Sequence, residues 1–157
     1  EGHQFDAVWS DDFHHSVRVA TTGVREAYFK SYDGTAQELA KTLDRGWTYC
    51  GEPFPYWKGR PRGSDCHHLP PSSFVFCIDN HDQSGNRAHG ERLGHLISAD
   101  RYRAASVLIC LSPYLPMLFM GQEWKAGTPF LFFSDLSGEL GRNVRAGRLE
   151  EFKSSGL

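Results

Sequence analysis

The sequence predicts an α/β fold built on parallel strands, and three observations support this prediction. Short apolar segments alternate along the chain with segments of helical periodicity. One segment, Phe74–Ile78, is apolar without interruption, as is typical of a strand buried on both faces of a parallel sheet. Polar residues follow each expected strand, and this is the edge at which parallel α/β folds bind their ligands.

The composition narrows the classes of protein to which the chain could belong. Its 157 residues suggest one domain, and 17 basic against 19 acidic residues give a net charge of −2. That balance argues against a protein that binds nucleic acid through a broad basic field. Apolar stretches such as Leu115–Gly121 are far shorter than the roughly 18–20 residues of a membrane-spanning helix, so no membrane partner is expected.

The four cysteines are few for this length, and none stands in a C-x-x-C pair. Cys77 and Cys110 lie in apolar runs, where a free thiol behaves as a small hydrophobic side chain. Cys66 precedes two histidines, but no second pair of ligands stands at zinc-finger spacing, so we expect no metal and no other cofactor. Reduced, unpaired thiols are typical of a cytoplasmic protein.

The first half of the chain predicts one strand, two helices and a long loop. These are expected over Phe5–Trp9, from Ser16 onward, over Ala36–Asp44 and over Trp47–Pro71. Thr35 and Glu38 match a capping box at the start of the second helix, and Gly46 follows its end. A loop as long as Trp47–Pro71 without secondary structure of its own is often functional.

The second half predicts two strands and two helical segments. They are expected over Phe74–Ile78, Gly90–Leu96, Arg101–Leu111 and Leu115–Met120. Asp100 is the expected cap of the longer helix, and Pro113 ends it. The apolar face of that helix is expected to be formed by Ala104, Ala105, Leu108 and Leu111.

Polar clusters stand at the ends of three expected strands. They are Asp11–His15, Asn80–Gln83 and Gln122–Trp124. One such cluster is commonly a turn or a helix cap, but three at the same edge of a parallel sheet indicate an active-site face. Aromatic side chains near these clusters, such as Trp9 and Trp124, suit either the stacking of sugar rings or ordinary core packing.

One cluster carries a specific resemblance. Asn80-His81-Asp82, after a buried strand, resembles the Asn-His-Asp signature of the alpha-amylase superfamily, whose members use a (β/α)8 barrel. An ordered set of blocks extends the resemblance to the malto-oligosyltrehalose trehalohydrolase family over nearly the whole chain. These blocks are Trp9–His15, Asn80–Ala88, Gly90–Leu93, Phe119–Trp124, Thr128–Asp135 and Val144–Arg148.

The resemblance implies a partial (β/α)8 barrel. Phe5–Trp9 would be strand six, Phe74–Ile78 strand seven and Leu115–Met120 strand eight. Residues 1–135 would be the C-terminal part of the catalytic barrel, and residues 136–157 its end, leading toward a C-terminal region. A whole barrel takes about 250 residues, and the chain lacks an initiator Met, so we expect a piece of a longer protein.

The implied activity is hydrolysis of the α-1,4-glucosidic bond next to the terminal trehalose of a maltooligosyl-trehalose, which releases trehalose. A retaining glycoside hydrolase needs a nucleophile that forms a glycosyl-enzyme and an acid that protonates the leaving oxygen. In the superfamily these carboxylates follow the fourth and fifth strands. Both are therefore expected before Glu1, and the chain alone is expected to be inactive.

The resemblance assigns roles to the cluster after the seventh strand. Asp82 is the expected catalytic residue, because a carboxylate there would stabilise the oxocarbenium-like transition state. His81 is expected to hydrogen-bond the same sugar, and Asn80 and Gln83 are expected to orient these two. A turn or capping aspartate is the alternative for Asp82, and a core histidine is the alternative for His81.

Other substrate contacts are expected on the acceptor side. Tyr28, Phe29 and Trp57 are candidate stacking platforms. Asp12 is expected to end strand six and to bind a trehalose hydroxyl, with a helix cap as the alternative. Asp11 and Asp12 are not expected to replace the missing carboxylate pair, because neighbours on a strand point to opposite faces.

Two other functions are weighed against this one. The first is a glycogen branching or debranching enzyme of the same superfamily, and the second is a carbohydrate-binding module without catalysis. The expected partner in each case is an α-glucan oligosaccharide, and the sequence leaves the oligomeric state open. Three positions depart from the family pattern, which puts the acceptor-side contacts in question: Lys58, Asp79 and Gln122.

Overall fold

The computed structural model describes residues 5–154 and contains a small parallel sheet. The strands are β1 (Val8–Trp9), β2 (Phe74–Phe76) and β3 (Leu115–Pro116), in the order β1-β2-β3. β2 pairs in parallel with both neighbours, so the predicted α/β arrangement of parallel strands is confirmed. All three strands are shorter than expected, and β2 ends at Phe76 instead of Ile78.

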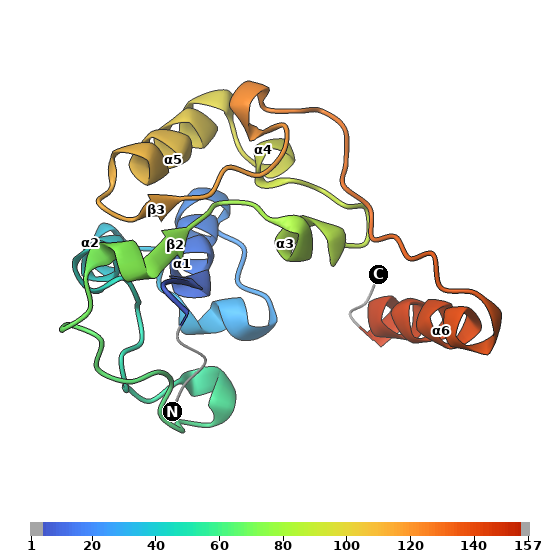
Figure 1. The fold of residues 1–157 in the computed structure, drawn as a ribbon, viewed down its shortest axis with the longest axis horizontal. Helices are drawn as coiled ribbons and strands as arrows, with labels where there is room; N and C mark the ends of the chain where they lie inside the picture. Colours follow the sequence, from blue (N-terminus) through green and yellow to red (C-terminus); the bar gives the residue numbers. More distant parts are fainter. Residues whose placement is uncertain (1–4, 155–157) are drawn as a thin grey trace.

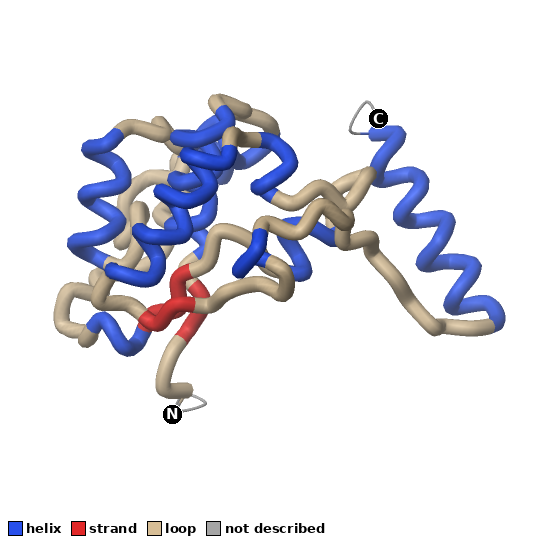
Figure 2. Tube along the Cα trace, turned by 90° about the horizontal axis from the view of Figure 1, so that it is seen from above, coloured by secondary structure: helices blue, strands red, loops and turns tan. Residues whose placement is uncertain are grey.

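Helices connect the strands (Figure 1). They are α1 (Asp11–Thr22), α2 (Ala36–Arg45), α3 (His81–Gly85), α4 (Leu93–Leu96), α5 (Ala99–Leu111) and α6 (Gly138–Ser154). Short 3-10 turns occur at Ala27–Ser31, Pro55–Trp57, Pro71–Ser73 and Gln122–Trp124. Figure 2 shows most helices gathered on one side of the three strands, as right-handed β-α-β crossovers require.

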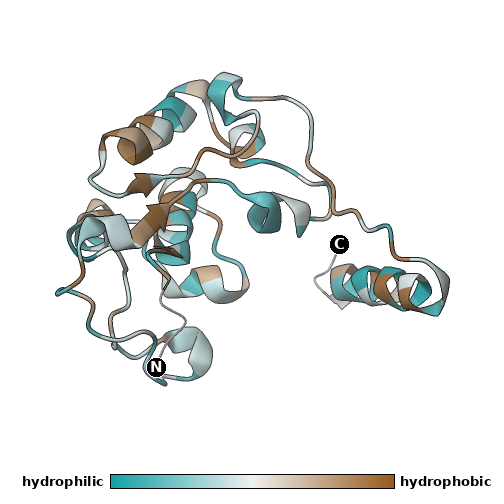
Figure 3. Cartoon of the chain, in the orientation of Figure 1, coloured by the Kyte–Doolittle hydropathy of each residue, from teal (hydrophilic) through white to brown (hydrophobic). Residues whose placement is uncertain are grey.

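The core lies between the sheet and these helices. Phe76 of β2 is fully buried and stacks between Phe13 of α1 and Tyr114, with ring centroids 4.1 and 4.0 Å apart. Val17 and Ile109 extend the same cluster into α1 and α5. Figure 3 shows the strands among the most apolar parts of the chain, whereas α3 is polar. The central strand therefore anchors the fold, and the polar helix begins just beyond it.

Helix α1 begins five residues before the expected position. Ser10 ends the β1 ladder by donating its backbone N–H to Val75, and its hydroxyl donates to the Gly46 carbonyl. Asp11 and Asp12 then occupy the first helical turn, where negative charge is favoured by the helix dipole. The expectation that these two residues lie on a strand was wrong, because the polar pair starts the helix.

Helix α2 confirms its predicted cap. The Thr35 hydroxyl accepts a hydrogen bond from the Glu38 amide, and the Glu38 carboxylate accepts from the amides of Asp33 and Gly34. The helix ends at Gly46 in the left-handed conformation, at φ +80°. This helix was located by local signals because its ends are determined by local hydrogen bonds.

Helix α5 differs from the prediction at its start and on its buried face. Ser98 is the cap, and its side chain accepts from the Arg101 amide, while Asp100 lies in the first turn. The buried stripe is Tyr102, Ala105 and Ile109, and Leu111 is 80% exposed. The expected apolar face was therefore partly wrong, because Tyr102 supplies its hydrophobic surface.

Helix α6 lies apart from the other helices in Figure 1, and it begins close to the expected boundary at residue 136. Arg148 ties it to the end of α3, because its guanidinium donates to the Asn86 side chain and to the Gly85 carbonyl. The same guanidinium lies over the rings of Phe132 and Phe152. Among the described residues, no helix is long and apolar enough to cross a membrane.

Candidate active site

The candidate site lies where β1 and β2 end, because α1 and α3 both begin there. Asn80 caps α3: its side-chain oxygen accepts from the Gln83 amide at 2.7 Å, and its amide nitrogen lies 3.7 Å from the Cys77 sulfur. His14 of α1 lies against the same strand end, with Nδ1 3.0 Å from the Ile78 carbonyl. These contacts fix the start of α3 relative to α1.

His81 and Asp82 form the first turn of α3 and point outward. Their side chains are 60% and 62% exposed, and His81 Nε2 lies 3.5 Å from the Asp82 carboxylate. The Trp9 ring meets the His81 ring edge to face, with centroids 5.9 Å apart. Asp82 therefore follows a strand that pairs in parallel and remains accessible, as a substrate-binding carboxylate requires.

Asp11 brings a second carboxylate to this edge. Burial raises the pKa of Asp11, and the Arg62 guanidinium opposes that rise. The carboxylates of Asp12 and Asp82 add repulsion, which raises the pKa of Asp11 further. Asp11, which follows β1, and Gln83, which follows β2, also line the same cavity.

Asp12 lies inside the protein with several internal partners. It is fully buried, and it pairs with Arg62 at 2.8 Å. It also accepts hydrogen bonds from the Tyr32 hydroxyl at 2.6 Å and from the backbone amides of Thr48 and Tyr49. These internal donors occupy its carboxylate, so Asp12 positions the long loop, and its contact with a sugar hydroxyl stays a prediction.

His15 extends this buried network. The Tyr32 hydroxyl donates its hydrogen to Asp12. The Tyr32 oxygen therefore accepts a hydrogen bond from His15 Nδ1, which lies 3.0 Å away. Burial, with the nearby His14 and Arg62, lowers the pKa of His15 to about 2. His15 is therefore neutral in the folded protein, with its proton on Nδ1.

A cavity of about 280 Å³ adjoins these residues, and we call it the aromatic cavity. It is lined by Asp11, His15, Tyr28, Phe54, Tyr56, Trp57, Arg62 and Gln83. The predicted residues Tyr28, Trp57 and Gln83 are thus brought together, although they come from three separate segments. Gln83 directly follows Asp82 in α3, so the cavity opens beside the exposed carboxylate.

Phe29 and Asn80 lie outside the lining of this cavity. Phe29 packs behind it, against the rings of Tyr28 at 4.5 Å and His15 at 5.1 Å, with the Arg18 guanidinium over its face. Asn80 is buried as the cap of α3. Asn80 thus holds the start of α3, next to the two residues that it was expected to orient. Phe29 supports the site from behind, and its role as a stacking platform stays a prediction.

Arg62 is the main residue that sequence reasoning missed. Its guanidinium pairs with Asp12 and lies over the rings of Phe54 and Trp57, at 4.6 and 5.8 Å from their centroids. It therefore fixes the loop that carries both rings. No local pattern marks it, because it stands in irregular chain. His15 could have been singled out, since it lies in one of the blocks that carried the resemblance.

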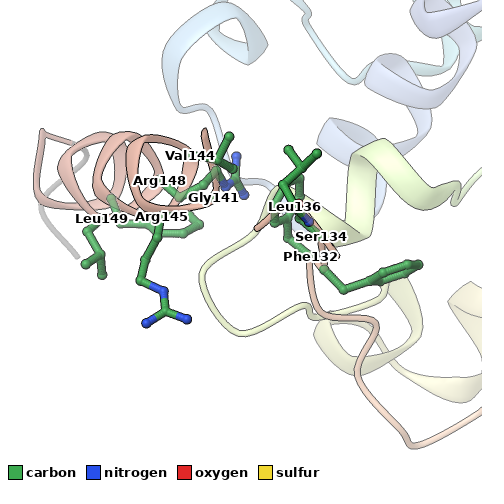
Figure 4. A pocket seen from close by; sticks show the side chains of 10 residues that line it. Phe132, Ser134, Leu136, Gly141, Val144, Arg145, Arg148 and Leu149 are labelled. Atoms are coloured by element: carbon green, nitrogen blue, oxygen red, sulfur yellow. The ribbon is translucent and has the colours of Figure 1, made fainter. Parts of the chain in front are cut away.

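A larger cavity, of about 390 Å³, lies between α6 and the segment before it (Figure 4). Phe132, Leu136, Val144 and Leu149 give it an apolar lining. Figure 4 shows Arg145 pointing away from the residues of the preceding segment. This cavity is not part of the candidate site, because its lining includes none of the carboxylates after β1 and β2.

The end of β3 contributes less than was expected. Trp124 is 72% exposed, and neither Glu123 nor Trp124 lines the aromatic cavity. Gln122 is buried, and it bonds the backbone of Phe119 and the hydroxyl of Ser106. Among residues 5–154, no group of three or more histidines, cysteines or carboxylates is placed to hold a metal ion.

The comparison with solved structures gives the class of protein. A crystal structure from Salmonella typhimurium described as an alpha amylase matches this chain with a TM-score of 0.88 and 45% identity. The match covers 96% of this chain and 26% of that one. The described residues thus share the fold of part of an alpha-amylase-like protein. No protein-family model matches the chain.

The curated relatives are more specific. Malto-oligosyltrehalose trehalohydrolase of Deinococcus radiodurans is 49% identical over 153 residues, and that of Saccharolobus solfataricus is 39% identical over 151 residues. They match 94% and 96% of this chain, which spans about a quarter of their length. Over nearly its full length, the chain is homologous to a segment of the malto-oligosyltrehalose trehalohydrolases, and the predicted resemblance is confirmed.

Proposed function

We propose that this chain is the C-terminal segment of the catalytic barrel of a malto-oligosyltrehalose trehalohydrolase. In this assignment β1, β2 and β3 are the sixth, seventh and eighth strands of a (β/α)8 barrel. Residues 1–135 belong to the barrel, and residues 136–157 lead toward a C-terminal region. The observation that carries the proposal is an exposed Asp82 after a parallel central strand, in a chain homologous to these enzymes.

The substrate is a maltooligosyl-trehalose, and the reaction is hydrolysis of the α-1,4 bond next to its trehalose end. The nucleophile and the acid of this retaining reaction come from strands four and five, in the part of the protein before this chain. Asp82 accepts hydrogen bonds from the hydroxyls of the distorted sugar, and its negative charge stabilises the oxocarbenium-like transition state. His81 hydrogen-bonds the same sugar.

The aromatic cavity serves the acceptor side in this proposal. Trp57 is 41% exposed and lines the cavity together with Tyr28, so a sugar ring that enters the cavity can stack on these aromatic side chains. The buried Asp12–Arg62 ion pair holds the Trp57 ring in place, because Arg62 lies over that ring and fixes the loop that carries it. Gln83 joins the cavity to Asp82 as its neighbour in α3.

The test is trehalose release by the full-length protein and by its Asp82→Asn variant. Loss of the charge should reduce kcat by about 10²–10³-fold, the range found when a group that stabilises charge in the transition state is removed. Asp100→Asn is the matched control, because Asp100 is 91% exposed on α5 and the chemical change is the same.

Three results would contradict the proposal. Equal trehalose release by the wild type and the Asp82→Asn variant would remove Asp82 from its catalytic role. New α-1,6 linkages in place of free trehalose would indicate a branching enzyme. Binding of the oligosaccharide without any product would indicate a carbohydrate-binding module.

A further inference from the structure

Two of the four cysteines are in direct contact, although no pattern in the sequence predicts it. The sulfur atoms of Cys50 and Cys66 lie 3.5 Å apart, while both residues are free thiols. Cys77 and Cys110 are separate from this pair: Cys77 is buried beside Asn80, and Cys110 is exposed on α5. A contact between two thiols is the arrangement that permits a disulfide with little backbone movement.

We propose that Cys50 and Cys66 are a redox-sensitive pair that a small-molecule disulfide closes into an intramolecular bridge. The bridge would close the base of the loop that carries Phe54, Trp57 and Arg62. The proposal concerns a modification site and does not depend on the proposed catalytic function, because the bridge can be detected without any measurement of activity.

The backbone around the pair is already arranged for a bridge. The Gly51 amide donates to the Arg62 carbonyl at 2.8 Å, and the Arg62 amide donates to the Glu52 carbonyl at 3.1 Å. These bonds hold the two arms of the loop side by side between the cysteines. A disulfide has an S–S length of about 2.05 Å, so the sulfurs, now 3.5 Å apart, must approach by about 1.5 Å to form the bridge.

The two thiols differ in their exposure to solvent, and this difference determines which of them reacts first with a small-molecule disulfide. Cys50 is half-buried, whereas Cys66 is buried, so Cys50 meets a reagent first. The Cys50 thiolate attacks oxidised glutathione, which forms a mixed disulfide and releases one glutathione thiolate. The Cys66 thiolate then attacks the Cys50 sulfur and displaces the second. Two protein thiols are oxidised, one glutathione disulfide is reduced to two thiols, and the thiol protons pass to the released glutathione.

The surroundings make the first step slow at neutral pH. Burial, followed by Cys66 and the Glu52 carboxylate, raises the pKa of Cys50 to about 12. Because the thiolate is the attacking species, oxidation should accelerate as the pH rises. The pair should therefore stay reduced in the presence of excess thiol and should close when small-molecule disulfides prevail.

The consequence is a stiffer wall of the aromatic cavity. The cysteines lie 16 positions apart, and the segment between them supplies Phe54, Tyr56, Trp57 and Arg62 to the cavity lining. A cross-link across a loop of this size removes much of its conformational freedom. Lys58, which is exposed in the same loop and is followed by Gly59, gives trypsin a site at which this change can be read.

The experiment treats the full-length protein with oxidised glutathione at pH 7 and pH 9, blocks the remaining thiols by alkylation and maps the peptides by mass spectrometry. We expect a Cys50–Cys66 cross-linked peptide, lighter by two hydrogen atoms, that forms faster at pH 9 and is reversed by dithiothreitol. Trypsin should cleave after Lys58 more slowly in the oxidised protein than in the reduced protein.

Matched variants complete the test. Cys110→Ser should form the bridge as the wild type does, and Cys50→Ser should not form it. Glutathione retained on Cys50 without a bridge, or pairing of Cys66 with Cys77 or Cys110, would overturn the proposal. Equal trypsin cleavage of the oxidised and reduced proteins would overturn the inferred stiffening of the loop. The wild-type map requires no substitution, so a misfolded variant does not affect it.

Discussion

At the residue scale, two buried carboxylates near the site have different surroundings. Asp12 pairs directly with Arg62 and accepts three further hydrogen bonds. Asp79 accepts from the Leu93 amide and the Ser84 hydroxyl, and within residues 5–154 no cationic side chain forms an ion pair with it. Burial therefore raises the pKa of Asp79 to about 6, although these donors oppose the rise. Asp79 is one of the positions that depart from the family pattern.

Asp79 predicts a specific dependence of stability on pH. The pKa of Asp79 is higher in the folded than in the unfolded state. Its contribution to the free energy of unfolding is therefore fully present below about pH 4, and it is lost as the pH rises through 6. Relative to Asp79→Asn, the wild type should lose roughly 1–3 kcal/mol of unfolding free energy between pH 4.5 and 7. Urea denaturation across this range measures the difference.

The control for this prediction is an aspartate whose carboxylate stays in water. Asp100 is 91% exposed, so Asp100→Asn should follow the wild type closely at every pH in the range. If Asp79→Asn and Asp100→Asn gave the same pH dependence, burial of Asp79 would not be the cause.

Arg62 predicts a large loss of stability when its charge is removed. Arg62→Ala leaves the Asp12 carboxylate buried without its cation, and breaking such a pair costs about 3–5 kcal/mol. Arg60→Ala, in the exposed part of the same loop, should change stability by less than about 0.5 kcal/mol. Chemical denaturation of both variants tests this, and similar small effects would show that the Asp12–Arg62 pair does not stabilise the loop.

At the element scale, the residue that ends a helix determines how closely that helix can pack against its neighbours. α1 and α2 both end at a glycine in the left-handed conformation, Gly23 at φ +73° and Gly46 at φ +80°. A side chain at Gly23 would meet nothing within 4 Å, whereas a Cβ at Gly46 would lie 2.6 Å from the Phe74 ring. Gly46 therefore serves both the turn and the contact of α2 with β2.

This pair of glycines gives a matched test. Gly23→Ala should cost about 1–2 kcal/mol, because only the left-handed backbone is strained. Gly46→Ala should cost about 1–3 kcal/mol more, because the Phe74 ring must also move. Thermal or urea unfolding of the two variants measures the difference, and equal losses would show that the packing of Phe74 adapts without cost.

The element boundaries show where sequence reasoning succeeds. α2 was located well because Thr35, Glu38 and Gly46 determine its ends by local hydrogen bonds. The start of α1 was misplaced because Ser10 bonds Val75 and Gly46, which lie far away in sequence. Helix ends that depend on distant partners carry no local signal.

At the scale of the whole molecule, the three-stranded sheet has an outer edge on β1 and another on β3. Apolar side chains along these strands are exposed, among them Val8, Trp9 and Leu115. Unpaired strand edges flanked by apolar surface favour association between chains.

Residues 1–157 produced alone should therefore associate or precipitate, and a longer protein that covers these edges should not. Sedimentation velocity of both proteins at matched concentration measures this. A monodisperse, cooperatively melting monomer of residues 1–157 would contradict the prediction and would weigh against a barrel completed by further strands.

The candidate site was predictable in part. Asp82, His81 and the helix cap Asn80 follow from a motif at the end of a buried strand, since a strand fixes where its next residues emerge. Tyr28 and Trp57 were found through the family resemblance, and the structure places them in one cavity. The buried pairing of Asp12 with Arg62 was not predicted, because sequence cannot show how many donors surround a carboxylate.

The sequence alone determined the α/β class with parallel strands, the central strand before Asp82, helix α2 and the relationship to the trehalohydrolases. These rest on local periodicity, on caps and on a motif order that the chain carries without reference to its fold. Only the tertiary structure decided that Asp12 is a buried partner of Arg62, that the aromatic cavity exists, and that Cys50 meets Cys66. Each of these joins segments that are distant along the chain, and such contacts arise only when the whole chain packs.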